Sequence, residues 1–302
     1  MAAIITVENL RKVYGTIVAV DDISFELAEE EIFGLLGPNG AGKTTTVECL
    51  QALRKPDSGM MNILGLDPRR DGPALRQQIG SQLQESALPD RLKVWEALDL
   101  FASVTPEALD WQILLTQWGL AEKCKSTFAS LSGGQRQRLF IALALVNNPR
   151  IVFLDEMTTG LDPAARHVAW DLIRSIRDRG ATVVLVTHFM DEAEKLCDRL
   201  AIIDRGKIVA MGTPQGLITE YASEVRVIFT TDREDLSWLD EIAQVKKVTR
   251  SGPRVEVEGS GSVLALVAAS LVEHGITPAD LRIEQPTLED VFLKLTGQDI
   301  GE

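Results

Sequence analysis

The sequence predicts an α/β protein: a mostly parallel sheet with an antiparallel β part and a helical subdomain, followed by a small α+β domain. Short β-branched runs alternate with helical patterns over the first part of the chain, which is typical of a parallel sheet covered by helices. Helical spacing then dominates an internal stretch, and a second strand-and-helix pattern begins near Tyr221. The 302 residues suit two domains of unequal size.

The strands of the first domain are indicated by composition. Several runs are short, apolar and rich in Val and Ile, as expected of strands buried on both faces of a sheet. One of them runs directly into a glycine-rich turn. The predicted strands are residues 4–10, 24–27, 31–37, 151–155 and 181–188.

A helical insertion interrupts this domain between Leu88 and Ser130. Residues 95–104 and 111–120 carry apolar side chains at the spacing of an amphipathic helix. We therefore expect a first domain of residues 1–222, with a helical subdomain at about 86–147.

The second domain is predicted at residues 223–302. Residues 224–231 and 254–259 alternate as strands do, and residues 262–275 form a helical pattern closed by a glycine. Thr287 and Asp290 have the spacing of a capping box that opens a last helix. The pattern indicates a small α+β fold.

Charge and cysteine content exclude several classes of protein. With 31 Lys and Arg against 44 Asp and Glu, the net charge of −13 disfavours broad binding to nucleic acid, and we expect no nucleic-acid partner. The N-terminus has no basic stretch followed by an apolar run, so we expect a cytosolic chain. Cys49, Cys124 and Cys197 lie far apart without a CxxC pair, which argues against a disulfide framework or a zinc site.

The strongest motif is a glycine-rich loop at residues 37–44, which fits the pattern GxxxxGK[ST] after a predicted strand and before a helix. Its backbone N–H groups are suited to binding phosphate oxygens. Lys43 adds a positive charge at the β- and γ-phosphates, and the Thr44 hydroxyl is placed to bind Mg²⁺.

Two carboxylates follow the apolar strand at residues 151–155. Ligands bind at the carboxyl end of strands in an open parallel sheet, so this is a candidate site. Asp155 can hold Mg²⁺, and Glu156 can act as the general base for the attacking water. A third signal, Ser132 followed by two glycines at the start of a helical pattern, predicts a second anion site at a helix N-terminus.

Together these motifs resemble the nucleotide-binding subunit of ATP-binding-cassette (ABC) transporters over about residues 3–220. The resemblance rests on GPNGAGKTT, LSGGQRQR and IVFLDE followed by TTGLDP. It implies that Gln84 is the Q-loop glutamine, Asp162 the D-loop aspartate, His188 the switch histidine and Tyr14 the aromatic that stacks on adenine.

The resemblance also implies a complete set of site residues. The catalytic residues are then Glu156, His188 and Gln84. The Mg²⁺ ligands are Thr44, Gln84 and Asp155. The residues in contact with ATP are Tyr14, Asn39, Gly40, Ala41, Gly42, Lys43, Thr44, Thr45, Ser132, Gly133, Gly134, Gln135 and Asp162.

One P-loop and one signature sequence in the chain imply that a complete site needs two chains, because in this family the signature serves the ATP bound by the partner. We expect a homodimer, or a heterodimer with a similar subunit, that closes over two ATP molecules. The ending EQPTLEDVFLKLTG resembles ABC-2-type export ATPases. That implies an integral membrane permease of ABC-2 type as partner, with this chain peripheral on the inner face of the cell membrane.

The chain departs from the family pattern after the catalytic glutamate, and two other protein classes are alternatives to the transporter subunit. Met157 stands where the family usually has Pro after the catalytic glutamate, which leaves the backbone there less constrained. An ABC ATPase of DNA repair or translation is disfavoured because the chain lacks a long coiled-coil insertion and a second cassette. A P-loop kinase is disfavoured by the LSGGQ sequence.

Overall fold

The computed structural model describes residues 3–82 and 87–297. The chain divides into two compact units, one up to Pro214 and one from Gln215 to Gly297. The sequence places the domain boundary slightly later, after residue 222. The two units are described separately below.

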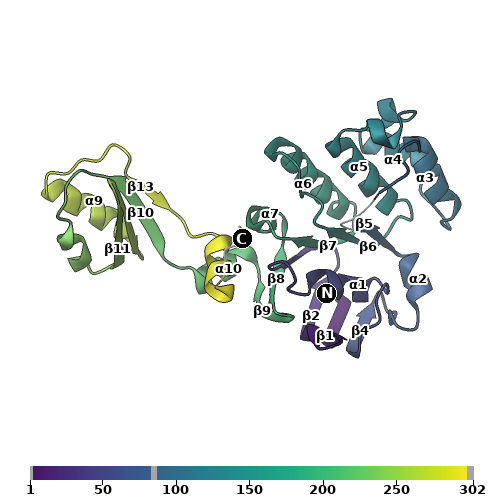
Figure 1. The fold of residues 1–302 in the computed structure, drawn as a ribbon, viewed down its shortest axis with the longest axis horizontal. Coiled ribbons are helices and arrows are strands. Elements are labelled where there is room, and N and C mark those ends of the chain that lie inside the picture. The colour runs from purple at the N-terminus through teal and green to yellow at the C-terminus, as the bar shows by residue number, and fades with distance from the viewer. Residues whose placement is uncertain (1–2, 83–86, 298–302) are drawn as a thin grey trace. The chain divides into compact units, whose positions relative to one another are not determined.

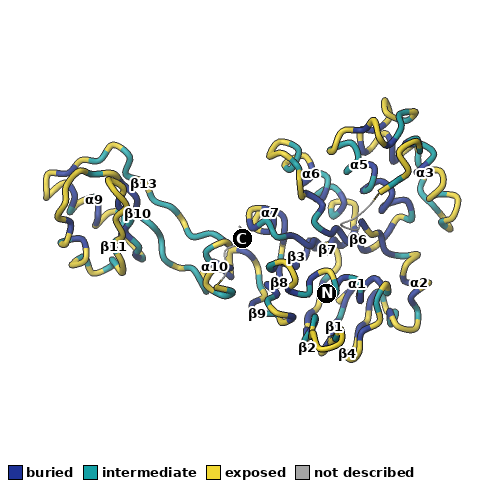
Figure 2. Tube along the Cα trace, viewed as in Figure 1, coloured by how far each residue is buried: buried dark blue, intermediate teal, exposed yellow. Residues whose placement is uncertain are grey.

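The first unit is built around a six-stranded sheet in the order β5-β6-β7-β3-β8-β9. The first five strands run parallel and β9 pairs antiparallel with β8. Every residue of β3, β6 and β7 is buried, as their apolar sequences predict, and Figure 2 shows this as a dark blue trace. The strands are β3 (Ile32–Leu36), β5 (Ile79–Gln82), β6 (Ile151–Asp155), β7 (Thr182–Thr187), β8 (Arg199–Asp204) and β9 (Lys207–Gly212).

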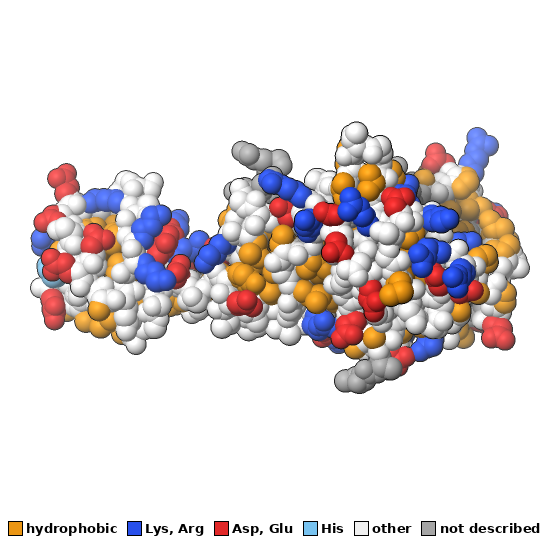
Figure 3. Space-filling model, turned by 90° about the horizontal axis from the view of Figure 1, so that it is seen from below, with side chains coloured by type: hydrophobic (Ala, Val, Ile, Leu, Met, Phe, Trp, Pro, Cys, Tyr) orange, Lys and Arg blue, Asp and Glu red, His pale blue; other side chains and the backbone are white. Residues whose placement is uncertain are grey.

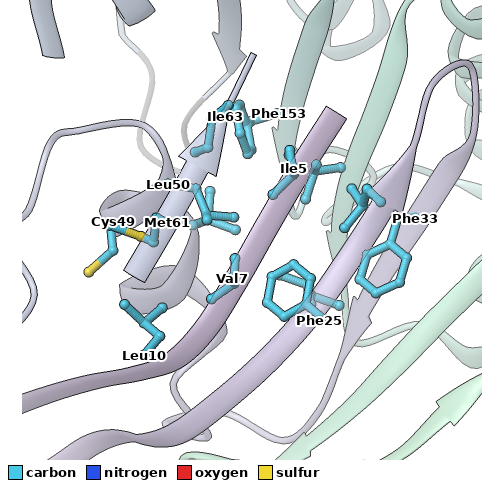
Figure 4. Packing of buried hydrophobic residues seen from close by; sticks show 14 of the residues in the cluster. Ile5, Val7, Leu10, Phe25, Phe33, Cys49, Leu50, Met61, Ile63 and Phe153 are labelled. Carbon is cyan, nitrogen blue, oxygen red and sulfur yellow. The ribbon is translucent and has the colours of Figure 1, made fainter. Parts of the chain in front are cut away.

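A second, antiparallel sheet has the order β2-β1-β4. Its strands are β1 (Ala3–Tyr14), β2 (Ile17–Ala28) and β4 (Ser58–Ile63), so the two strands predicted here are parts of longer ones. Figure 4 shows how the two sheets share a core: Ile5, Phe25, Met61 and Ile63 pack in one cluster with Phe33 and Phe153 of the parallel sheet. This packing holds the end of the β1–β2 hairpin near the start of α1 (Lys43–Leu50).

The helical subdomain is confirmed, with α3 (Val94–Ser103), α4 (Trp111–Gln117) and α5 (Gly133–Ala144). In Figure 1 these helices gather at one end of the unit, apart from β1, β2 and β4. α2 (Gly72–Arg76) precedes β5, while α6 (Pro163–Arg177) and α7 (Met190–Leu196) follow β6 and β7.

The second unit begins with α8 (Pro214–Tyr221) and contains an antiparallel sheet in the order β11-β12-β10-β13. This is the strand order of a split βαβ fold in which a 3₁₀ turn (Ser237–Glu241) replaces the first helix. The predicted capping box is confirmed, since the Asp290 carboxylate accepts from the Thr287 N–H over 2.8 Å. Its elements are β10 (Val225–Thr230), β11 (Val245–Ser251), β12 (Arg254–Gly259), α9 (Val263–Glu273), β13 (Arg282–Glu284) and α10 (Leu288–Thr296).

The distribution of charged side chains and the state of the cysteines agree with what the composition indicates. Acidic and basic side chains are interspersed on the face shown in Figure 3. All three cysteines are free, as predicted. Within the described ranges, none of the helices combines the length and the apolar composition that a membrane crossing requires.

Candidate functional site

Three neighbouring strands of the parallel sheet bring the main motifs to one edge. β3 leads into the glycine-rich loop, β6 ends in Asp155, and β7, which lies between them, ends in Thr187. The register aligns Leu36 with Thr187 and Asp155 with Val186, so the three strand ends lie level. Parallel strand ends are where ligands bind in such sheets, and here the loop, the carboxylates and His188 meet.

The glycine-rich loop folds tightly around the Lys43 ammonium. Lys43 is buried, and its Nζ donates to the carbonyl oxygens of Gly37, over 2.7 Å, and Pro38, over 3.0 Å. Burial lowers the pKa of Lys43, while the charges of Glu156 and Asp155 oppose that shift. The Lys43 ammonium therefore faces both carboxylates at the mouth of the loop.

The glycines of this loop are required by close packing against other backbone segments, as well as for phosphate binding. A Cβ at Gly37 would lie 2.2 Å from the Ile203 carbonyl oxygen. Gly42 has φ +104° and its Cβ would lie 2.1 Å from the Ala19 carbonyl oxygen. Asn39 and Gly40 form the exposed tip, and Ala41 is buried behind it. The loop thus leaves its tip open toward solvent while its base is closed.

Asp155 and Thr44 form a pair suited to a divalent cation. The Thr44 hydroxyl lies near the Asp155 carboxylate and favours its charged form, and Thr45 follows Thr44 on α1. Asp155 is almost wholly buried, and its Oδ1 has no hydrogen-bond partner in the parts of the chain described. Burial and then the Glu156 charge raise the pKa of Asp155 to about 6. A buried, unpartnered oxygen beside a hydroxyl fits a Mg²⁺ ligand pair.

Glu156 and His188 lie side by side at the ends of β6 and β7. His188 Nδ1 is 3.4 Å from Glu156 Oε1, a close contact without the alignment of a hydrogen bond. Glu156 has φ +48°, a left-handed conformation that is uncommon for a residue with a side chain. Its N–H donates to the Val186 carbonyl over 2.9 Å, which attaches the strained turn to β7.

The signature residues form the start of α5. Ser132 is the N-cap: its Oγ accepts from Gln135 N–H over 3.4 Å, and Gln135 Oε1 accepts from Ser132 N–H over 3.0 Å. Ser132 and Gly133 are exposed, and Gly134 is half-buried. The N-terminus of α5 is therefore built and open to an anion, on a different part of the unit from α1 (Figure 1).

Two further predicted residues lie outside this cluster of strand ends. Tyr14 is partly exposed at the end of β1, with the Arg54 guanidinium 5.3 Å and the Lys12 ammonium 5.4 Å from its ring centroid. Asp162 is exposed and caps α6, accepting from the Ala165 N–H over 2.8 Å. Gln84 lies outside the described residues.

Two contacts near the carboxylates, one part-buried and one buried, were not predicted. Gln137, five residues into the signature helix, donates through Nε2 to the carbonyl oxygen of Met157, the residue after Glu156. Glu192 is wholly buried and accepts from Trp170 Nε1 over 3.0 Å. The only sequence signal for either is position: Gln137 belongs to the LSGGQRQR motif, and Glu192 follows His188 by one helical turn.

A cavity of about 570 Å³ lies between β5 and the helical subdomain. Phe101, Val104 and Phe140 contribute its apolar wall. Gln51 and Gln82 also line it, and their buried amide oxygens have no hydrogen-bond partner in the described parts of the chain. The cavity is thus an apolar groove with polar groups at its base.

A parallel sheet with a P-loop lysine, an Asp–Thr pair and an adjacent Glu–His pair at one edge defines a P-loop nucleoside-triphosphatase. Residues 20–159 match the family described as ABC transporter. The chain is 38% identical to Nod factor export ATP-binding protein I of Paraburkholderia xenovorans, with 99% of each chain covered. It is 36% identical to daunorubicin resistance ATP-binding protein DrrA3 of Streptomyces coeruleorubidus, covering 98% of this chain and 96% of that one.

Solved structures agree in fold. An ATP-binding subunit of an ABC transporter superposes with a TM-score of 0.65 at 28% identity, over 72% of this chain and 93% of that one. A dimeric ATP-binding cassette, bound to ADP and Pi in a post-hydrolysis state, gives a TM-score of 0.63 at 26% identity, over 69% and 98%. The chain belongs to the ATP-binding proteins of the ABC transporter family, and it is an ATPase.

Proposed function

We propose that this chain powers an exporter of ABC-2 type by hydrolysing Mg²⁺-ATP at a site shared by two chains. The observation that carries the proposal is the level alignment of the P-loop, Asp155–Glu156 and His188 on three adjacent strand ends. The relatives that span nearly the whole chain are named as export and drug-resistance ATP-binding proteins, which supports export as the direction.

The chemistry follows from the charges. Lys43 and the loop N–H groups bind the β- and γ-phosphates, and Asp155 with Thr44 would hold Mg²⁺, which neutralises charge on those phosphates when bound. Water attacks the γ-phosphorus, the bond to the β–γ bridging oxygen breaks, and Glu156 accepts the proton of the water. His188, 3.4 Å from Glu156, would contact the same γ-phosphate.

The second half of the site comes from another copy. The start of α5 exposes Ser132 and Gly133, while the P-loop belongs to a different part of the unit. A dimeric cassette among the similar structures supports pairing of two chains. In the proposed pair the chains lie head to tail, so that the signature of one completes the site of the other. Closure over ATP and opening after hydrolysis then provide two states that a transporter can use.

The permease contact is proposed at the apolar groove lined by Phe101, Val104 and Phe140, whose chemistry suits a short helix with one apolar face. Gln82 and Ala87, which line the groove, flank in the sequence the segment that contains the predicted Q-loop glutamine Gln84. Held there, the chain would lie at the inner face of the cell membrane. Tyr14, exposed at the end of β1, is proposed to stack on adenine.

The variant Glu156→Gln tests the proposed hydrolysis. The amide cannot accept the water's proton, so the turnover number is expected to fall at least about 100-fold. ATP binding should remain, and the dimer should accumulate in Mg²⁺-ATP, which size-exclusion chromatography with light scattering measures. An undiminished turnover number would remove Glu156 from the role of general base.

A further inference from the structure

Glu192 is a carboxylate buried completely behind the catalytic edge of the sheet. Burying a charged or even a protonated carboxyl is costly unless donors surround it. Burial raises the pKa of Glu192, and hydrogen bonds from Thr187, Thr158 and Trp170 oppose that shift. A methionine or leucine would fill the same space without this cost. The presence of a carboxylate therefore indicates a specific role, and its contacts indicate which one.

The donors come from three different segments. Trp170 Nε1, on α6, donates to Glu192 Oε1 over 3.0 Å. The Thr187 hydroxyl, at the last residue of β7, lies near the same carboxylate and favours its charged form. The Thr158 hydroxyl also faces it, in poorer geometry, since Glu192 Oε2 and Thr158 Oγ1 lack aligned partners in the described parts of the chain.

Each of these segments carries one of the predicted site residues. Thr158 follows Glu156 by two residues, and Thr187 directly precedes His188. Trp170 lies on the helix that Asp162 caps. The Glu192 carboxylate therefore lies against polar groups of the Glu156 turn, the His188 turn and the helix of Asp162.

The contact at Thr187 reaches His188 through one more bond. Thr187 Oγ1 accepts from the Phe189 N–H over 3.0 Å, and the same hydroxyl lies near the Glu192 carboxylate. His188 lies between Thr187 and Phe189, so this hydrogen bond helps to fix the backbone that carries the histidine side chain. On the other side, the Glu156 N–H donates to Val186, the residue before Thr187.

We propose that Glu192 is a positioning residue for ATP hydrolysis, which holds the Glu156 and His188 turns together through Thr187, Thr158 and Trp170. It touches neither nucleotide nor water and acts only through the 3.4 Å contact of Glu156 with His188. The proposal rests on the roles proposed above for these two residues. A small displacement of a catalytic group is enough to slow a reaction strongly.

The test uses the full chain with Glu192→Gln, which keeps the size of the side chain but turns an N–H toward donors. We expect the turnover number to fall about 10- to 100-fold. ATP affinity should stay within about twofold, since the P-loop is untouched. Glu194→Gln, an exposed change on the same helix, is the matched control and should turn over at the wild-type rate.

A residue that acts through Glu156 has a signature that a merely structural residue lacks. In the double variant with Glu156→Gln, the loss should equal that of Glu156→Gln alone. Trp170→Phe, which deletes the indole N–H donor and keeps an aromatic side chain, should lower the turnover number by a smaller factor without changing ATP affinity. If Glu192→Gln yields no folded protein, Trp170→Phe decides by the same criterion.

Two results overturn the proposal: an unchanged turnover number in Glu192→Gln, or losses that multiply in the double variant. A proportional loss of ATP affinity and turnover also overturns it, because that is the behaviour of a fold that is generally damaged. If Glu156→Gln itself hydrolyses ATP at full rate, the failure belongs to the proposed role of Glu156 instead.

Discussion

The Lys43 ammonium donates to the carbonyl oxygen of Gly37 over 2.7 Å, so the glycine-rich loop is closed by its own cation. The same ammonium faces Asp155 and Glu156, whose charges favour its protonated form. A loop that is already ordered around its lysine has less conformational freedom to lose when phosphate binds.

Lys43→Ala is expected to weaken ATP binding about 10- to 100-fold, because a charge-assisted hydrogen bond contributes about 1.5–3 kcal/mol. Titration with a fluorescent ATP analogue measures the affinity. Lys123→Ala, which removes an exposed lysine on the helical subdomain, controls for the change in net charge. Equal affinities of the Lys43 variant and the wild type would contradict the proposed phosphate contact.

Asp155→Asn is expected to stabilise the nucleotide-free chain above pH 6. The pKa of Asp155 is raised from 3.8 to about 6, so the native state holds more protons than the unfolded state between these values. Stability therefore falls as pH rises through this range, by about 3 kcal/mol once the carboxylate is ionised. Asparagine does not ionise, so the variant does not lose this stability as the pH rises.

Denaturant unfolding in the presence of a chelator, at about pH 4.5, 6 and 7.5, measures the difference in the free energy of unfolding. The gap between variant and wild type should widen with pH, from about 1 kcal/mol at pH 4.5 to about 3 kcal/mol at pH 7.5. Added Mg²⁺-ATP should stabilise the wild type and have little effect on Asp155→Asn. A variant that is less stable than the wild type at pH 7.5 would show that the buried carboxylate is favourable.

Mixed dimers of two tagged chains test the shared site. When Lys43→Ala is in one chain and Ser132→Glu in the other, both changes fall in one shared site, and about half the activity should remain. When one chain carries both changes, each shared site is damaged and activity should be nearly lost. The introduced carboxylate repels phosphate but suits a helix N-terminus, so α5 should stay folded. The reverse pattern of activities would mean that each chain works alone.

Phe101→Glu is expected to release the chain from its membrane partner. Phe101 is 41% exposed and lines the apolar groove, where a carboxylate cannot be buried cheaply. Co-purification with the membrane fraction of native cells measures binding. Met60→Glu, at a side chain that is 62% exposed on β4, is the matched control. Retention of Phe101→Glu at the wild-type level would place the permease contact elsewhere.

Much of the fold was predictable because apolar runs and glycine turns are local signals. The buried strands β3, β6 and β7 and the helices of the insertion follow from composition and spacing. β5 and β4 were not predicted, since Ile-Gly-Ser-Gln is short and β4 is half exposed. These two strands acquire their structure from the pairing partner that the rest of the chain supplies.

The sequence alone identifies the chemical groups of the site. It shows a lysine and a threonine after a glycine loop, two carboxylates after an apolar strand, and a capped signature helix. Only the tertiary structure decided which of these groups touch. The 3.4 Å contact of His188 with Glu156 depends on the pairing of β6 with β7. The role proposed for Glu192 depends on its burial, which only the tertiary structure shows. The sequence around a glutamate in a helix does not tell whether its side chain is solvated or enclosed by polar groups of other segments.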